Sequence, residues 1–176
     1  MDEKFYIEIT ESMNKVIQNV KAKKTQITKA TVRALNKTAS WAKTRVIEEL
    51  SKKKQIKKKL VRNRVWIRKA TRNYMNARIR VGLYAIKAAR LGRMKQTARG
   101  TFAGKEFFEG AFIAMMPTGH VGIFKRKYSS SLPISEEKIN IEKDVIETAR
   151  NLENYDTERV FEKYFIHEIN YILKKL

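Results

Sequence analysis

The feature that most constrains the fold is a change in hydrophobic period along the chain. From Ile27 to Leu50, apolar and small side chains recur every three to four residues, which predicts a long amphipathic helix. From Val61 to Arg68, and again over Ala77–Tyr84, apolar and polar residues alternate instead. Because Thr71–Tyr74 supplies a turn between these two runs, the pattern predicts an antiparallel hairpin.

The helical pattern before the hairpin covers about Ile9 to Lys53, either as one helix or as two helices with a break near Lys23–Lys24. A further short helix with a solvated basic face is predicted over Lys52–Leu60. The alternation in Glu3–Thr10 fits either a short strand or the start of a helix, and the sequence does not separate the two.

More strands are predicted after the hairpin. Met94–Ala98 and Phe107–Met116 have strand character, and Thr101–Lys105 between them is expected to be a flexible loop. Within the second segment, Ala111–Met116 is apolar without polar alternation, which predicts a central strand covered on both faces. His120–Lys125 forms the next strand and completes a second hairpin.

The C-terminal part returns to a helical period. After a linker at Ser129–Ser131, helices are predicted over Asp144–Leu152 and Thr157–Leu176, and Glu168 is the exception on the apolar face of the second. The expected fold class is α+β: one or two long N-terminal helices, an antiparallel sheet or small barrel of four to six strands, and a C-terminal helix. Residues 1–176 are expected to form a single domain, helical over 1–60, sheet over 61–128, and linker with terminal helices over 129–176.

The net charge of +21 is unevenly distributed. Leu50–Lys105 contains 19 Lys and Arg and no acidic residue, whereas Ser131–Leu176 has a net charge of −3. An unopposed positive field of this size attracts polyanions such as nucleic acid, an acidic membrane surface or an acidic protein. A basic surface kept for solubility is the alternative, although solubility alone does not require one acid-free block.

The predicted hairpin places arginines on both of its strands, and like charges on neighbouring strands repel each other. An acidic partner would relieve that repulsion, so this face is a candidate contact surface. The aromatic residues Trp66, Tyr74 and Tyr84 lie among these arginines, where they could stack on single-stranded bases or simply pack in the sheet. The candidate contact residues, for DNA or for a neighbouring subunit, are Arg62, Arg64, Arg68, Arg78, Arg80, Lys57 and Lys58.

Catalytic motifs are largely missing. With no Cys and two His, the chain has few metal ligands, and it lacks phosphate-binding and nucleophile motifs, so no enzyme activity, metal or cofactor is expected. His120, close to Lys125 and Arg126, leaves a nuclease hypothesis open, but no second His or Glu is close in sequence. His120 is interpreted as a turn residue whose ring nitrogens bond backbone groups, and His167 as a packing residue in the last helix.

No apolar run is long enough to span a bilayer, and the N-terminus lacks the pattern of a secretory signal. We therefore expect a protein that is made and used on the cytoplasmic side, with no membrane partner.

Four strings, in the same order, resemble those of the phage minor tail protein Z family. They are the helix at Thr31–Thr44, the basic segment that begins at Gln55–Lys58, the strand and turn of Phe112–Arg126, and Leu132–Glu136. The resemblance covers roughly residues 25–137.

The resemblance implies a virion structural protein of a tailed phage or prophage: a minor tail subunit that completes the tail at its head-proximal end, near entering DNA. It also implies other tail proteins as partners, a homo-oligomeric ring, and possible contact with double-stranded DNA. Gly119, His120, Arg126 and Pro133 match the family pattern, with Gly119 allowing a tight turn, His120 pinning that turn and Pro133 fixing the chain where it leaves the sheet. A non-specific nucleic-acid-binding module is the alternative function.

Overall fold

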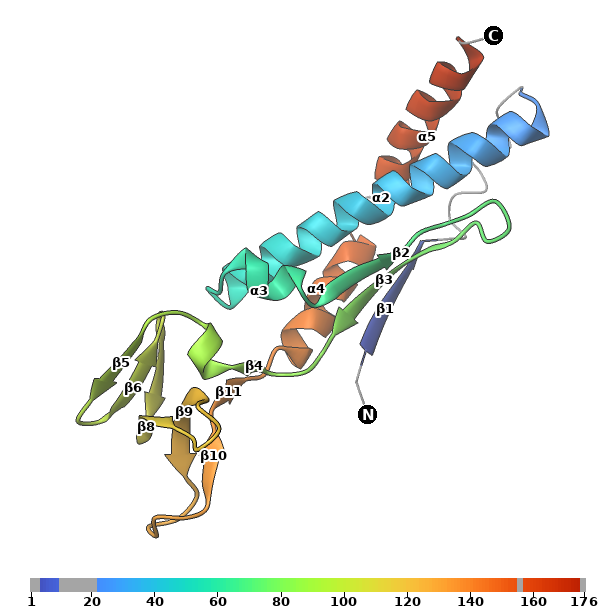
Figure 1. The fold of residues 1–176 in the computed structure, drawn as a ribbon. Coiled ribbons are helices and arrows are strands. Elements are labelled where there is room, and N and C mark those ends of the chain that lie inside the picture. The colour runs from blue at the N-terminus through green and yellow to red at the C-terminus, as the bar shows by residue number, and fades with distance from the viewer. Residues whose placement is uncertain (1–3, 10–21, 155–156, 175–176) are drawn as a thin grey trace.

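A long helix, α2 (Lys24–Lys53), runs along the molecule, and the other helices and the first strands pack against it (Figure 1). The computed structural model describes residues 4–9, 22–154 and 157–174. Because α2 begins at Lys24, it starts beside the predicted break; the N-terminal part of the predicted helical region, 10–21, lies outside the described residues. The apolar stripe read from the sequence is the buried side of α2.

Two C-terminal helices, α4 (Glu142–Asn154) and α5 (Thr157–Leu173), pack against α2. Small side chains on the buried side of α2 leave room for this packing. In α5, Phe161 and Phe165 supply the bulk, both fully buried and stacked with their ring centroids 5.8 Å apart. The small buried residues of α2 are Ala30, Thr31, Ala34, Thr38, Ala39 and Ala42. The predicted terminal helices are confirmed.

The predicted hairpin is confirmed as β2 (Val65–Arg68) and β3 (Ala77–Gly82), which pair antiparallel. The N-terminal segment β1 (Lys4–Ile9) is a strand and pairs with the other edge of β3, so the alternative of a helix start is wrong. Since β2 and β3 contact α2 and β1 contacts α4, the helices cover one face of this three-stranded sheet.

The predicted short helix over Lys52–Leu60 is partly wrong. α2 continues to Lys53, and a separate helix, α3 (Lys58–Arg62), begins later. Between them Gln55 has a φ of 50°, a left-handed conformation that ends the helix. Ile56 is buried after this turn, so its apolar side chain redirects the chain towards the core.

Short strands form three further small sheets at the end of the molecule away from the C-terminus (Figure 1). β4 pairs with β11 and joins this region to the helices, while β5–β6–β7 and β8–β9–β10 form antiparallel three-stranded sheets. The bounds are β4 Ile86–Lys87, β5 Met94–Thr97, β6 Gly100–Ala103, β7 Glu106–Glu109, β8 Ala111–Met115, β9 Val121–Arg126, β10 Ile134–Glu136 and β11 Lys138–Ile139, with a 3-10 turn at Ala88–Arg90.

Two predictions in this region are wrong. Thr101–Lys105 is not a flexible loop, because it contributes most of β6, the central strand of its sheet. Ala111–Met116 is not a central strand, because β8 lies at the edge of its sheet. Its apolar run is explained by packing on β6, and the Gln96 side chain replaces a neighbouring strand by accepting a hydrogen bond from the Ile113 amide (2.8 Å).

The α+β class, with a long N-terminal helix and a C-terminal helix, is confirmed. The strands of the described residues do not share one sheet of four to six strands, since they divide among four sheets of two or three strands. The reason lies in the connections: β5, β6 and β7 have four residues each and are joined by two-residue turns, so they pair with each other rather than with β3.

Candidate subunit and nucleic-acid interface

The outer face of the β2–β3 hairpin brings three of the predicted arginines together. The strand register places Trp66 opposite Arg80 and Arg68 opposite Arg78. The alternate positions of both strands are buried or half-buried, and both strands contact α2. These four side chains therefore share the face that points away from α2, as the two-residue period predicts. We call the surface formed by Trp66, Arg68, Arg78 and Arg80 the arginine face.

Within the arginine face, the guanidinium of Arg80 lies over the ring of Trp66, 4.7 Å from its centroid. This cation–π contact fixes Arg80 against a ring that is still 39% exposed. The Arg80 Nε is buried and has no hydrogen-bond partner among the described residues. An unsatisfied buried donor costs about 1–3 kcal/mol of stability.

The arginine face is hollowed. A depression of about 510 Å³ is lined by the four side chains together with Ile67, and none of these lining residues is acidic. Arg68 of β2 and Arg78 of β3 occupy directly paired positions, and the position of β1 paired with Arg78 is Glu8. With three arginines and no acidic residue among the described residues that line it, the depression is basic.

Arg62 and Arg64 do not belong to this face, contrary to the prediction. Arg62 lies exposed in α3, and Arg64 is buried, with 4% of its surface exposed. Its guanidinium donates hydrogen bonds to the carbonyls of Leu60 (3.2 Å) and Ala85 (3.4 Å) and stacks on Tyr84. Burial lowers the pKa of Arg64, as expected for a cation withdrawn from water. Arg64 is thus a structural residue that ties α3 to the chain after β3.

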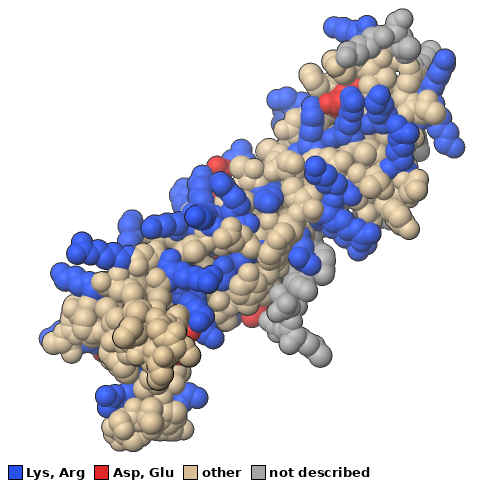
Figure 2. All heavy atoms as spheres, in the orientation of Figure 1, with Lys and Arg blue, Asp and Glu red and all other residues tan. Residues whose placement is uncertain are grey.

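The basic segment around α3 is exposed but partly neutralised by acids from elsewhere. Lys57 precedes α3 and is exposed, while the Lys58 ammonium lies 3.1 Å from the Glu48 carboxylate. The Lys54 ammonium pairs with Asp144 at 2.9 Å. The segment Leu50–Lys105, which has no acidic residue in its sequence, therefore lies next to acidic residues from other parts of the fold. Figure 2 nevertheless shows Lys and Arg side chains along the whole length of the face in view, with few acidic side chains among them.

The turn between β8 and β9 has the expected geometry at Gly119, whose φ is +77°. The side chain of His120 bonds to a carboxylate, whereas the prediction had it bond to backbone groups. Its Nε2 lies 2.8 Å from Glu136 Oε1 in β10, while the Lys87 ammonium lies 2.7 Å from Oε2. Burial disfavours the charged carboxylate, but the hydrogen bonds from Lys87 and His120 outweigh it and lower the pKa of Glu136.

Glu136 is the residue that sequence reasoning missed, because it lies 16 positions from His120. The structure thus supplies the Glu neighbour that the nuclease hypothesis lacked. Both carboxylate oxygens are engaged, one by His120 and one by Lys87, so the contact joins β4, the β8–β9 turn and β10. This arrangement fits a structural cross-link.

The other matched turn residues also hold the small sheets. The Arg126 guanidinium lies over the ring of Phe112, 5.6 Å from its centroid. Pro133 directly precedes β10, so it fixes the chain where it re-enters the sheet rather than where it leaves. His167 is exposed, and the prediction that it is a packing residue of the last helix is wrong.

Across the described residues, no group of three or more His, Cys, Asp or Glu is arranged to hold a metal ion. None of the described helices is long and apolar enough to cross a membrane.

The fold and this surface define a basic α+β protein whose distinctive feature is the arginine face. The comparisons identify its family. The profile of "Prophage minor tail protein Z (GPZ)" matches residues 11–176, so the chain belongs to this family of phage minor tail proteins. It is also 31% identical to the tail completion protein of Escherichia phage N15 over 134 residues, which cover 69% of this chain and 73% of that protein. No solved structure matches.

Proposed function

We propose that this protein is a structural subunit that completes the phage tail at its head-proximal end, where it assembles as a homo-oligomer. Family membership and the similarity to a tail completion protein support this proposal. In this role the chain acts as one domain without catalytic activity or cofactor. It is made in the host cytoplasm, incorporated into the virion tail, and binds other tail proteins.

The arginine face is the contact through which we propose that the subunit meets its neighbour. The observation that carries this part of the proposal is the depression that Trp66 lines together with the three arginines of this face. Tryptophan and arginine are among the residues most enriched in protein–protein hot spots, and such hot spots lie in desolvated pockets. We propose that an acidic side chain of the adjacent subunit occupies this depression.

The test is complementation of a phage that lacks this coding region. We expect lysates without the gene to contain full heads beside detached or malformed tails, and the wild-type gene to restore infectious particles. The double variant Arg68→Gln/Arg80→Gln is expected to restore at least tenfold fewer. Lys95→Gln/Lys105→Gln removes the same charge from exposed positions of another sheet and should restore wild-type titres.

The two parts of the proposal fail separately. Normal virions in the absence of the gene would overturn the tail-completion role. Full restoration by the arginine variant, expressed at wild-type level, would overturn only the role of the arginine face.

The second candidate is a non-specific nucleic-acid-binding module, favoured by the net charge of +21. DNA could also be the partner of the arginine face. If DNA contacts this face, the arginine variant binds DNA with a salt dependence weaker than that of the lysine control; if the face binds a subunit, the two variants bind DNA alike.

A further inference from the structure

A second basic surface lies along α2, between the β2–β3 loop and α5. Two hollows, of about 640 Å³ and 650 Å³, follow one another along the helix. The same three elements line both: residues of α2, a basic residue of the loop, and aromatic or apolar residues of α5. We call this surface the helix–loop groove; its principal lining residues are Lys29, Arg33, Lys37, Lys69, Arg72 and Tyr164.

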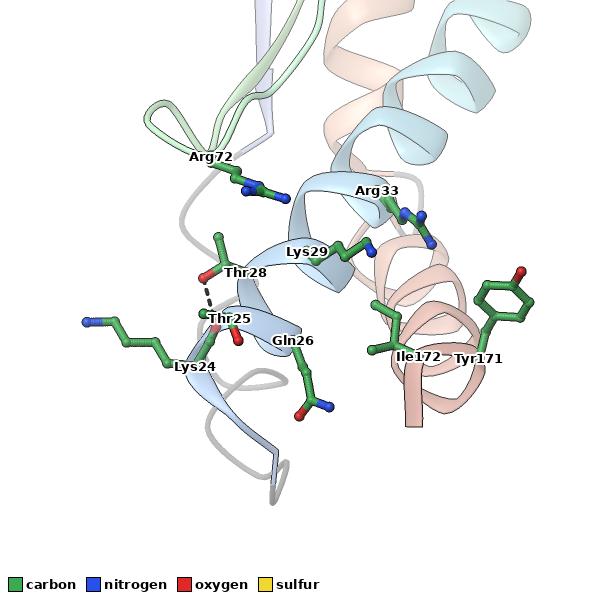
Figure 3. Close-up of a pocket in the computed structure, with 9 residues that line it drawn as sticks. All are labelled: Lys24, Thr25, Gln26, Thr28, Lys29, Arg33, Arg72, Tyr171 and Ile172. Atoms are coloured by element: carbon green, nitrogen blue, oxygen red, sulfur yellow. Dashed lines mark hydrogen bonds between the residues drawn. The ribbon is translucent and has the colours of Figure 1, made fainter. Parts of the chain in front are cut away.

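The cations of the groove form a row. Lys29, Arg33 and Lys37 are spaced by four residues on α2, so they follow one another at about 6 Å along the helix axis. Arg72 reaches from the loop towards α2, whereas Lys29 and Arg33 extend towards α5 (Figure 3). Lys69 adds a further charge beside the second hollow. No acidic residue is among the described residues that line either hollow.

The loop that forms one wall is held in place. The Asn36 side chain of α2 accepts a hydrogen bond from the Ala70 amide (2.8 Å) and donates one to the Ala70 carbonyl (3.1 Å). Because Ala70 lies between Lys69 and Arg72, this pair of hydrogen bonds holds both cations beside α2. A partner that binds here therefore meets a largely preformed surface, with little ordering cost for the backbone.

The chemistry of the groove differs from that of the arginine face. Lysine predominates in it, and lysine is depleted at protein–protein interfaces. A row of positive charges flanked by an aromatic ring is, however, what a sequence-independent groove for the nucleic-acid backbone requires. Tyr164 lies in this groove, half-buried, with the Lys37 ammonium 5.9 Å from its ring centroid. We propose that the helix–loop groove binds the phosphodiester backbone of nucleic acid, without reading base sequence.

The test compares two triple variants of the full chain with the same net charge. Lys29→Gln/Lys69→Gln/Arg72→Gln removes three exposed cations of the groove, and leaves Arg33 and Lys37, which pair with Glu168, unchanged. The control, Lys95→Gln/Arg99→Gln/Lys105→Gln, removes three exposed cations from the β5–β7 sheet. Fluorescence anisotropy of a labelled 20-mer, as duplex and as single strand, is measured over a series of salt concentrations.

The groove variant is expected to bind DNA at least tenfold more weakly than the control at 0.1 M salt. The slope of log K against log salt should fall by about 2 to 3 for whichever DNA form occupies the groove, because each phosphate that the protein neutralises adds about 0.7 to 0.9 to that slope. Thermal unfolding confirms that both variants fold. Equal weakening in the two variants, for both DNA forms, would overturn the proposal, because net charge alone would then account for binding. Binding of polyglutamate is measured in the same way, as a probe for an acidic protein. If the groove variant loses as much affinity for polyglutamate as for DNA, the proposal is overturned and an acidic protein becomes the partner of the groove.

This proposal does not depend on the tail-completion role. The variants leave the arginine face unchanged, and the readout is DNA binding by purified protein, so the two proposals fail independently.

Discussion

Replacing Glu168 by Gln tests how α5 is held on α2. Glu168 is buried on the apolar side of α5, with 7% of its side chain exposed. Its two carboxylate oxygens meet two cations of α2: Arg33 at 3.1 Å and Lys37 at 2.6 Å. Burial disfavours the charged carboxylate, but hydrogen bonds from Lys37 and Arg33 outweigh it and lower the pKa of Glu168. The substitution keeps the shape of the side chain and removes its charge.

The expected loss of stability is moderate. Breaking a fully buried ion pair costs about 3–5 kcal/mol, largely because the remaining charge is left in the interior. Arg33 and Lys37 are 42% and 46% exposed, so water solvates them when the carboxylate is lost. We therefore expect a loss of about 1–2 kcal/mol in the free energy of unfolding. For a chain of this length, that lowers Tm by roughly 2–8 °C.

The assay is thermal unfolding of wild type, Glu168→Gln and the control Glu162→Gln, an exposed position of the same helix. Since the folded pKa of Glu168 is lowered, its contribution is present above the unfolded pKa of about 4.3 and is lost as pH falls through the folded value. The difference in the free energy of unfolding between wild type and Glu168→Gln should have its full size at pH 7 and shrink steadily below pH 4. A variant as stable as the control at pH 7, or a gap unchanged in acid, would refute the reasoning.

Two further substitutions test local contacts. Asn36→Ala removes both bonds to the backbone of Ala70 and should cost about 1–3 kcal/mol in thermal unfolding, with faster amide exchange at Ala70; unchanged exchange would show that the bonds do not hold the loop. Gly119→Ala places a side chain at a φ of +77°, where no atom would contact the new Cβ, so about 1–2 kcal/mol of backbone strain is expected; wild-type Tm would contradict it.

The sequence predicted the elements that bury one continuous face. The stripe on α2, the apolar side of α5 and the alternation of β2 and β3 each follow one period over many residues, and each was confirmed. β6 was not predicted as a strand, because four residues are too few to show a two-residue alternation, and Gly100 and Gly104 are typical of a loop. The edge position of β8 was not predicted, because β8 is covered by β6 of another sheet and by the Gln96 side chain. The sequence alone does not show that either lies beside β8.

The candidate sites were predictable to different degrees. Strand alternation placed Arg68, Arg78 and Arg80 on one face. It failed for Arg64, because the strand begins one residue later and the side chain turns inward. The helix–loop groove could be predicted only in part, because the sequence shows the four-residue spacing of Lys29, Arg33 and Lys37 on α2. The wall formed by the β2–β3 loop depends on tertiary packing.

Glu168 also links stability to the proposed groove, because its charge lies beside two of the groove cations. Removing that charge weakens the packing of α5 and, at the same time, leaves Arg33 and Lys37 free to meet phosphate. We therefore expect Glu168→Gln to be less stable than wild type yet to bind DNA several-fold more tightly at low salt. The reason is that the repulsion between the Glu168 carboxylate and a bound phosphate several ångströms away, about 1 kcal/mol, is removed. A general loss of structure would lower both the stability and the DNA affinity of the variant. A variant with lower stability and higher DNA affinity therefore indicates that Arg33 and Lys37 bind DNA and do not serve only to pack α5 on α2. If DNA affinity falls or stays unchanged while the fold is intact, Arg33 and Lys37 serve only to pack α5.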